Sequence, residues 1–566
     1  MTNNKKTFLL SFLILAAVNV FVFYPSFFTA AKADHIVYMT ETAEMESLPE
    51  LISYSFSYPR TRVLLSGDKI LFRPIFYTVL SIEKWLWGYN VIHWQLTGLI
   101  LHLIILALFM TLLKTIKPDP MATLFVLFFS MQYISCSLVT WHHMHGYLLF
   151  LILLLSALIN FTLYIQSRHE DVKKLLIMAA FLFLACFTNE FGSVASLIIM
   201  LALLGHKKFI LNSSLRGSNR SKNDAAILNN PYILLISPVI FTYVNCLDYM
   251  LRFPGRGIAQ NLAHINFFAA LVKCFYQFIA LVLTSFILPF SPGMFAIFPG
   301  EKNYAVLFSM IEMKLLGSLN QAVYINNLVL FVLLFAVFGI LIWVRIKRKT
   351  ISTDMPDLER KKEAKNSLTV MVLSFGLLLS YIFVLVFFRT SGSSLKYISR
   401  NLYHFYIMTL IAAVIVFCLF VRACNVMGNW RTVFRRLVII ILCLGLLLNG
   451  LKVYQLNRQE REAFSPWGNY IMKLESFVKA HKDEADFSFQ SISRNDGYAT
   501  IIRMGDIPEN KELKGYISDF FFRKYIDVYD PKYYVVYTRK EGISAFTSKE
   551  KAEQYLNKRK KDEGKR

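Results

Sequence analysis

Long runs without charged residues recur along most of the chain and constrain its fold more than any other feature. Residues 8–30, 371–388 and 437–450 are examples. Most runs are at or near the roughly 18–20 residues that cross a bilayer as a helix. One large soluble core does not explain them, because single cores stop growing at about 250–300 residues. The chain is therefore expected to be an all-α polytopic membrane protein.

Basic residues gather in the segments between these runs. The chain has 61 Lys and Arg against 37 Asp and Glu, a formal charge of +24. Clusters fall at residues 114–117, 173–174, 207–222, 345–365 and 431–436. Positive loops at membrane boundaries orient the helices. This pattern indicates a protein that lies among membrane lipids, and it disfavours a nucleic-acid partner.

The positive-inside rule gives a map of about eleven transmembrane helices in the cell membrane. The N-terminus is expected in the cytoplasm, with an uncleaved first helix. The helices are expected near residues 7–30, 91–113, 120–140, 146–166, 174–188, 191–206, 232–250, 327–344, 368–388, 402–421 and 437–454. Residues 264–290 are also apolar, but one more crossing there would move the basic segment 345–365 outside. We interpret residues 264–290 as re-entrant, interfacial, or half of a hairpin.

The composition changes after residue 450. Residues 1–454 are expected to form the transmembrane domain, and residues 455–566 a small extracytoplasmic α/β domain. Strand-like runs occur at 487–492, 500–504 and 533–537, and a helix-like run at 467–479. The basic tail, residues 549–566, is expected to be solvated and partly disordered.

On this map, ionisable residues gather in short segments at the outer face. Such residues at the mouth of a helix bundle are costly and therefore indicate function. Arginine binds phosphate in a bidentate manner, and a nearby carboxylate can act as a general base. The group comprises Asp34, His35, Arg73, His142, His143, His145, Glu190, Arg389, Lys396 and Arg400. Together they suggest a site for an anionic lipid headgroup, although each could be an ordinary loop charge.

Three histidines lie in one expected turn. His142, His143 and His145 could bind a metal, but no Asp, Glu or Cys stands beside them in the sequence. We interpret them as interfacial polar anchors beside Trp141. A histidine within an apolar run, such as His102, is more often a buried, hydrogen-bonded helix residue than a ligand. No metal site or other cofactor is expected.

Several motifs resemble those of a known family. Asp34-His35 follows the first helix, and Arg73 begins an Arg-Pro stretch. Gln95, Gly98 and His102 follow an H-x-x-N-x-x-x-H pattern in which Gln and Gly replace the first two residues. Asn189-Glu190 stands where a Lys-Glu pair is common, and residues 399–403 form an Arg-x-Leu-Tyr-like motif. In order and spacing, the chain resembles the GT-C membrane glycosyltransferases, most closely the protein O-mannosyltransferases and their tetratricopeptide-linked relatives.

This resemblance implies an enzyme that transfers a monosaccharide from a polyprenyl-phosphate carrier, with inversion, at the outer face of the membrane. Asp34 would be the catalytic base, and Glu190 a second site carboxylate. Arg400, Arg73 and Tyr403 would hold the carrier phosphate. His35, His102 and Lys396 are further candidates for substrate binding. The acceptor would be a lipid, a glycan or a protein, and the tetratricopeptide repeats are absent.

Two other classes of function remain open. The chain could be a transporter or flippase for a lipid-linked sugar, although such proteins usually place charges at the bilayer midplane in two related halves. It could also be a non-catalytic membrane assembly subunit whose C-terminal domain binds a partner. Charges on one face and no evident internal symmetry favour the glycosyltransferase.

Overall fold

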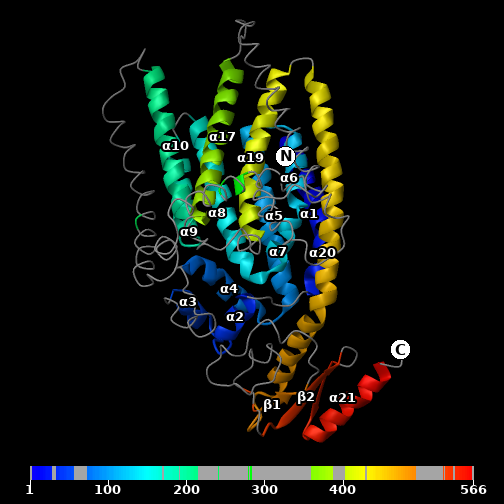
Figure 1. Cartoon of the computed structure of the whole chain (residues 1–566). Coiled ribbons are helices and arrows are strands. Elements are labelled where there is room, and N and C mark those ends of the chain that lie inside the picture. The colour runs from blue at the N-terminus through cyan, green and yellow to red at the C-terminus, as the bar shows by residue number, and fades with distance from the viewer. Residues whose placement is uncertain are drawn as a thin grey trace, which may run out of the picture. The chain divides into compact units, whose positions relative to one another are not determined.

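The structure is a computed structural model, and it is mostly helical (Figure 1). It describes residues 3–28, 34–56, 73–167, 171–189, 191–214, 358–386, 402–427, 430–492, 530–538 and 542–563, with a few isolated positions between them. Within these residues, six helices are long and apolar enough to cross a membrane. This agrees with a membrane protein. The count of eleven stays a prediction, and residues 232–250, 264–290 and 327–344 fall outside the described ranges.

The expected apolar helices within these ranges are present. They are α1 (Asn3–Phe23), α5 (Val91–Ile116), α6 (Met121–Ser130), α7 (Tyr133–Thr140), α8 (His145–Gln166), α9 (Val172–Cys186), α10 (Phe191–Ser214), α17 (Leu358–Val384), α19 (Leu402–Val426) and α20 (Arg431–His481). The segment expected as one helix at 120–140 is divided in two, α6 and α7. Helix α20 continues through residue 455, where a domain boundary was expected.

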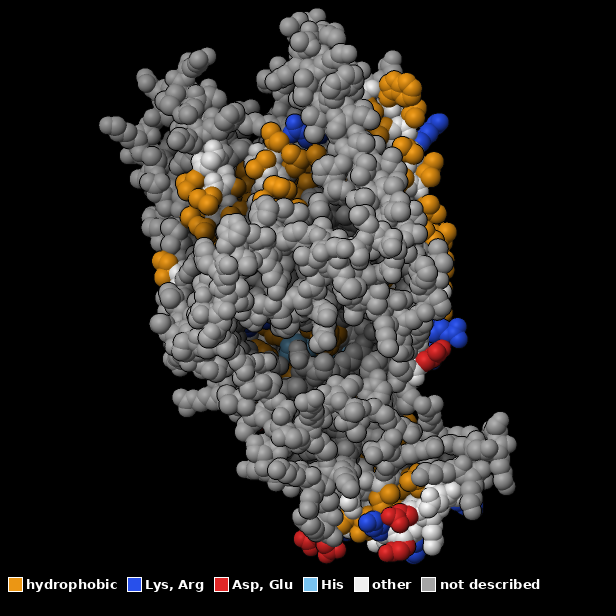
Figure 2. All heavy atoms as spheres, in the orientation of Figure 1, with side chains coloured by type: hydrophobic (Ala, Val, Ile, Leu, Met, Phe, Trp, Pro, Cys, Tyr) orange, Lys and Arg blue, Asp and Glu red, His pale blue; other side chains and the backbone are white. Residues whose placement is uncertain are grey.

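The chain divides into two compact units. The first contains Met1–Val22, Leu101–Leu138 and Tyr147–Gln455. In it, α17 packs against both α10 and α19, and the three helices run alongside one another (Figure 1). From Leu437 to Leu451, the exposed side chains of α20 are apolar and include Ile440, Leu444 and Leu447. Orange side chains mark this edge in Figure 2. An outward apolar face is typical of a helix in lipid, where apolar side chains lose nothing by exposure.

The second unit contains Phe23–Ile100, Val139–Gly146 and Leu456–Arg566. Three short helices that the sequence analysis did not expect lie in its first part: α2 (Asp34–Glu41), α3 (Leu48–Phe56) and α4 (Pro74–Trp87). Helices α3 and α4 pack against each other, and α2 packs against the 3-10 helix His142–Met144. Pro74 at the first helical position favours the start of α4, because proline is preorganised for that position and needs no N–H there.

The C-terminal part of this unit holds a small sheet, as expected. Its strands are β1 (Phe489–Ser491), β2 (Tyr533–Thr538) and β3 (Gly542–Phe546), in the order β1-β2-β3. Strands β1 and β2 are parallel, and β2 and β3 are antiparallel. The end of α20 packs on this sheet through Tyr470 and Phe477. The expected strand at 500–504 lies outside the described residues.

The basic tail differs from the expectation. Residues Lys549–Glu563 form helix α21, which packs on β2 and β3. Ala552 is fully buried there, and the Tyr555 ring contacts Phe546. The prediction of a partly disordered tail was wrong for these residues. Ala552 and Tyr555 give the helix an apolar contact with the sheet beneath it.

Candidate functional site

Four histidines and one glutamate are buried together in the second unit. His35 comes from α2, Glu83 from α4, and His142, His143 and His145 from the turn that precedes and opens α8. We call these five residues the histidine cluster. Burial of so many ionisable groups costs free energy unless they are paired. Their partners therefore define what the cluster can do.

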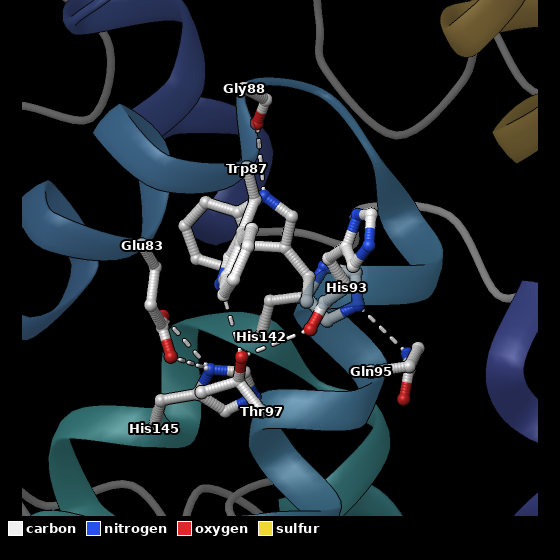
Figure 3. Close-up of polar contacts among 9 residues, drawn as sticks. Glu83, Trp87, Gly88, His93, Gln95, Thr97, His142 and His145 are labelled. Carbon is white, nitrogen blue, oxygen red and sulfur yellow. Dashed lines mark hydrogen bonds and ion pairs between the residues drawn. The ribbon is translucent and has the colours of Figure 1, made fainter.

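Glu83 and His145 form the tightest pair of the cluster. Both carboxyl oxygens of Glu83 face Nδ1 of His145, at 2.8 and 3.0 Å (Figure 3). Glu83 is 4% exposed and His145 is fully buried. Burial raises the pKa of the Glu83 carboxyl, and the adjacent imidazole partly opposes this rise. Since an oxygen and a nitrogen at this distance need a hydrogen between them, the pair holds at least one proton.

Gln95 on α5 fixes the state of His142. Its amide nitrogen donates to the carbonyl oxygen of Thr140 at 2.9 Å. The same nitrogen lies 2.8 Å from Nε2 of His142 (Figure 3). A carbonyl only accepts, so the NH2 group of Gln95 must face Thr140, and its second hydrogen points to His142. Nε2 of His142 is therefore the acceptor. We infer that His142 is neutral, with its proton on Nδ1.

His35 lies against Trp94 and His142. Its ring is 4.5 Å from the ring of Trp94 and 4.9 Å from that of His142, edge to face in both cases. Burial lowers the pKa of His35 well below its usual range, and the nearby His145 lowers it further. His35 is thus neutral at physiological pH. Glu83 is the one carboxylate of the histidine cluster, and it faces His145.

Two glycines allow these elements to approach closely. A Cβ on Gly98 would lie 2.5 Å from the carbonyl oxygen of Val139 and 2.7 Å from Nε2 of His145. A Cβ on Gly146 would lie 2.1 Å from the ring of Phe76. All three distances are shorter than van der Waals contact. The glycines therefore set how near α5 and α4 come to the histidine turn.

Arg73 and Lys84 flank the cluster on α4. Arg73 immediately precedes the helix, is 8% exposed, and places its guanidinium over the ring of Phe76. That ring is 5.3 Å from the ring of His143. Lys84 donates to the carbonyl oxygen of Met45 at 3.3 Å. Burial lowers the pKa of Lys84 to about 7, although Glu46 opposes the shift.

The cluster retains unused hydrogen-bonding capacity. Nδ1 of His35, Oε1 of Gln95 and Nε2 of His145 are buried and lack a hydrogen-bond partner among the described residues. Oε1 of Gln95 is an acceptor in the amide orientation derived above, and an imidazole nitrogen donates or accepts according to its tautomer, so the group is suited to exchange hydrogen bonds with hydroxyl groups or water. Within the described part of the chain, no group of three or more His, Cys, Asp or Glu is arranged to hold a metal ion.

The structure places only some of the site residues expected from sequence. Arg73 and His35 lie in or beside the histidine cluster, and Asp34 is the first residue of α2, next to His35. His102 is buried in α5 and bonds the hydroxyl of Tyr406 at 2.9 Å, as expected for a helix histidine. The remaining candidates cannot be placed: Glu190, Arg389, Lys396 and Arg400 lie outside the described residues, and Tyr403 opens α19 without a described side chain.

The interpretation of the histidine turn was wrong. His142, His143 and His145 are buried rather than interfacial, and an acid does stand beside them: Glu83, 62 residues earlier than His145. The sequence analysis also missed Lys84 and the role of Gln95. The available signal was that Glu83 and Lys84 are the charged residues of an otherwise apolar stretch that starts with Pro74. No protein-family model matches the chain, and no curated protein sequence matches it.

Proposed function

We propose that the protein is a membrane glycosyltransferase that takes a monosaccharide from a polyprenyl-phosphate carrier and transfers it to a lipid, glycan or protein acceptor. The observation that carries this proposal is the buried histidine cluster next to Asp34. Buried ionisable groups at the end of a membrane-spanning helix mark function by default. Here the cluster adjoins the first turns of α5, through Trp94 and Gln95.

The proposed reaction needs a base beside a hydroxyl, and the start of α2 offers one. Asp34 is the proposed base that takes the proton from the acceptor hydroxyl as that oxygen attacks the anomeric carbon. The unpartnered Nδ1 of His35 and the acceptor Oε1 of Gln95 suit a hydroxyl-rich ligand such as a sugar. His35 is neutral, so it adds hydrogen-bonding capacity without adding a charge that would hold Asp34 in an ion pair.

The carrier phosphate needs a positive site, and the beginning of α4 supplies one. Arg73 contributes a guanidinium, and the N-terminal end of the 14-residue helix α4 adds the positive end of its dipole. Arg400 and Tyr403 are proposed as further phosphate ligands, and Glu190 as a carboxylate that orients a sugar. Stabilising charge on the departing phosphate would lower the barrier to transfer.

The test is transfer by the full-length protein in lipid vesicles. Labelled polyprenyl-phosphate sugars are supplied inside or outside the vesicles, with membrane extract as the acceptor source, and release of polyprenyl phosphate is measured. We expect release for the wild type and its loss in Asp34→Asn. Glu50→Gln, which neutralises an exposed carboxylate on α3, is the matched control and should retain activity.

Each alternative gives a different outcome. A flippase moves the labelled donor across the bilayer without releasing the carrier, and an assembly subunit does neither. Wild-type activity that survives in Asp34→Asn would refute the assignment of the base while leaving the reaction intact. We further expect Arg73→Ala to raise the donor concentration needed for half-maximal rate.

A further inference from the structure

Helix α4 carries its charges inward and its apolar side chains outward. Its exposed side chains are Ile82, Trp85 and Leu86, between 39% and 51% exposed. Its two charged residues, Glu83 and Lys84, are 4% and 7% exposed. A helix on the surface of a soluble domain has the opposite pattern, with charged residues facing water. The exposed stripe is regular, because positions 82, 85 and 86 share one helical face.

The end of α4 is hydrogen-bonded to the start of the spanning helix α5. Trp94 donates from Nε1 to the carbonyl oxygen of Gly88 at 2.9 Å, and Trp87 donates to the hydroxyl of Thr97 at 3.2 Å (Figure 3). The ring of Trp87 also stacks on that of His93, with 4.9 Å between centroids. Three residues join the helices, so Trp87 at the end of α4 lies within about 14 Å of Val91 at the start of α5.

The start of α5 also has an apolar exposed face. Past His93, the exposed residues of α5 in this unit are Leu96 and Ile100, both apolar. Trp87 lies between the two stripes, because it stacks on His93 and bonds Thr97. An apolar surface that runs from the side of one helix onto a membrane-spanning helix is continuous with the lipid-facing surface of that helix. Tryptophan is also enriched where such surfaces meet the headgroup layer.

We propose that the face of α4 formed by Ile82, Trp85 and Leu86 is embedded in the bilayer and contacts phospholipid acyl chains. Helix α4 is then an in-plane membrane helix, and its inner face carries Glu83 toward His145. The side of α4 that faces lipid keeps water from that side of the Glu83–His145 pair. This inference does not depend on the proposed glycosyltransferase activity.

Photo-crosslinking tests the proposal with the full-length protein and its native cysteines. The photoreactive residue p-benzoylphenylalanine replaces Trp85 or, in a second variant, Leu86. Both positions are exposed, so the bulky ring meets no core side chain. The protein is placed in vesicles of synthetic phosphatidylcholine and phosphatidylglycerol, irradiated, and analysed by mass spectrometry of intact protein and peptides.

Two reference positions calibrate the yield. Leu444, an exposed apolar residue of the spanning part of α20, should give a phospholipid adduct. Glu553, an exposed residue of the polar helix α21, should give none. We expect adducts at 85 and 86 within about twofold of the Leu444 yield, as for a similar apolar environment. A yield like that of Glu553 would overturn the proposal, and so would adducts to a second copy of the chain in place of lipid.

Discussion

Replacing Gly98 by alanine tests the close packing of α5 against the histidine turn. The new methyl group would lie 2.5 Å from the carbonyl oxygen of Val139 and 2.7 Å from Nε2 of His145. Neither neighbour can move cheaply. The carbonyl belongs to the backbone, and the imidazole is held on its other side by Glu83 at 2.8 Å.

The expected magnitude comes from two opposing terms. Alanine in place of glycine within a helix gains about 0.8–1.0 kcal/mol of intrinsic propensity. Extra methyl groups in a packed core cost about 1–3 kcal/mol, and more when backbone must shift. Displacing His145 also weakens its bond to Glu83, worth about 1.5–3 kcal/mol for a charged group. We therefore expect Gly98→Ala to lower the free energy of unfolding by about 1–3 kcal/mol.

Gly205→Ala is the matched control. Gly205 lies within α10, and nothing lies within 4 Å of the position its Cβ would take. Only the propensity term remains, so this variant should gain up to about 1 kcal/mol. The two substitutions are chemically identical, and we expect them to change the free energy of unfolding in opposite directions.

Reversible unfolding by SDS titration in mixed micelles, followed by circular dichroism and tryptophan fluorescence, measures both variants. A lower free energy of unfolding in Gly98→Ala, together with a higher or unchanged one in Gly205→Ala, supports the close packing of α5 against the histidine turn. If Gly98→Ala unfolds at the same or a higher SDS fraction than the wild type, α5 does not approach the histidine turn as closely as described.

Substitutions at three further positions test the buried polar groups by the same titration. Glu83→Ala should lower the free energy of unfolding by about 3–5 kcal/mol, because it leaves the His145 imidazole without its carboxylate. Glu83→Gln should cost less, because its amide oxygen still accepts from Nδ1–H of His145. Equal losses in the two variants would contradict the hydrogen bond. The pKa of Lys84 is about 7 in the folded protein and 10.5 for the free side chain. Between these pH values the unfolded chain binds more protons than the folded one. The free energy of unfolding should therefore rise with pH across that window. Lys84→Met should remove that rise, on the order of 5 kcal/mol, and an unchanged pH profile would refute the burial. Tyr406→Phe should cost about 1–3 kcal/mol by removing the hydroxyl bonded to Nδ1 of His102, and no loss would mean that the bond adds nothing.

The sequence predicts the long helices and the sheet well because both signals are local. An uncharged apolar run such as that of α8 needs no partner to be recognised, and the alternating pattern of residues 533–537 coincides with β2. The expected strand at 487–492 contains β1 for the same reason. These elements are set by composition over five to twenty-five consecutive residues.

The short helices between Asp34 and Trp87 were not predicted. Apolar side chains such as Leu51 and Leu80 are buried within that stretch. In α4, the usual rule for assigning a face also fails. Charged residues are normally assigned to the exposed side, whereas Glu83 and Lys84 are buried. The reason is their partners, His145 and the Met45 carbonyl, which are distant in sequence.

The candidate site shows the same division between local and distant information. Asp34, His35 and Arg73 were singled out from their positions after or before apolar runs, and the structure places His35 and Arg73 in buried positions. The grouping of His35, Glu83, Gln95 and the histidine turn depends on contacts across tens of residues, which no single-sequence pattern reports. Gly98 and Gly146 complete that grouping. Their importance is visible only once their neighbours in the fold are known.

The inward charges of α4 also determine its rotation about its own axis. A half-turn of the helix would move Glu83 and Lys84 outward and bring Trp85 and Leu86 against the histidine turn. Either surrounding would leave His145 without its acid. In water, that loss would be opposed by exposing the charges and burying apolar area, which are both favourable. In a bilayer, the rotated helix would instead place two charges in lipid, which is unfavourable. The observed rotation of α4 therefore supports the proposed contact of its outer face with lipid.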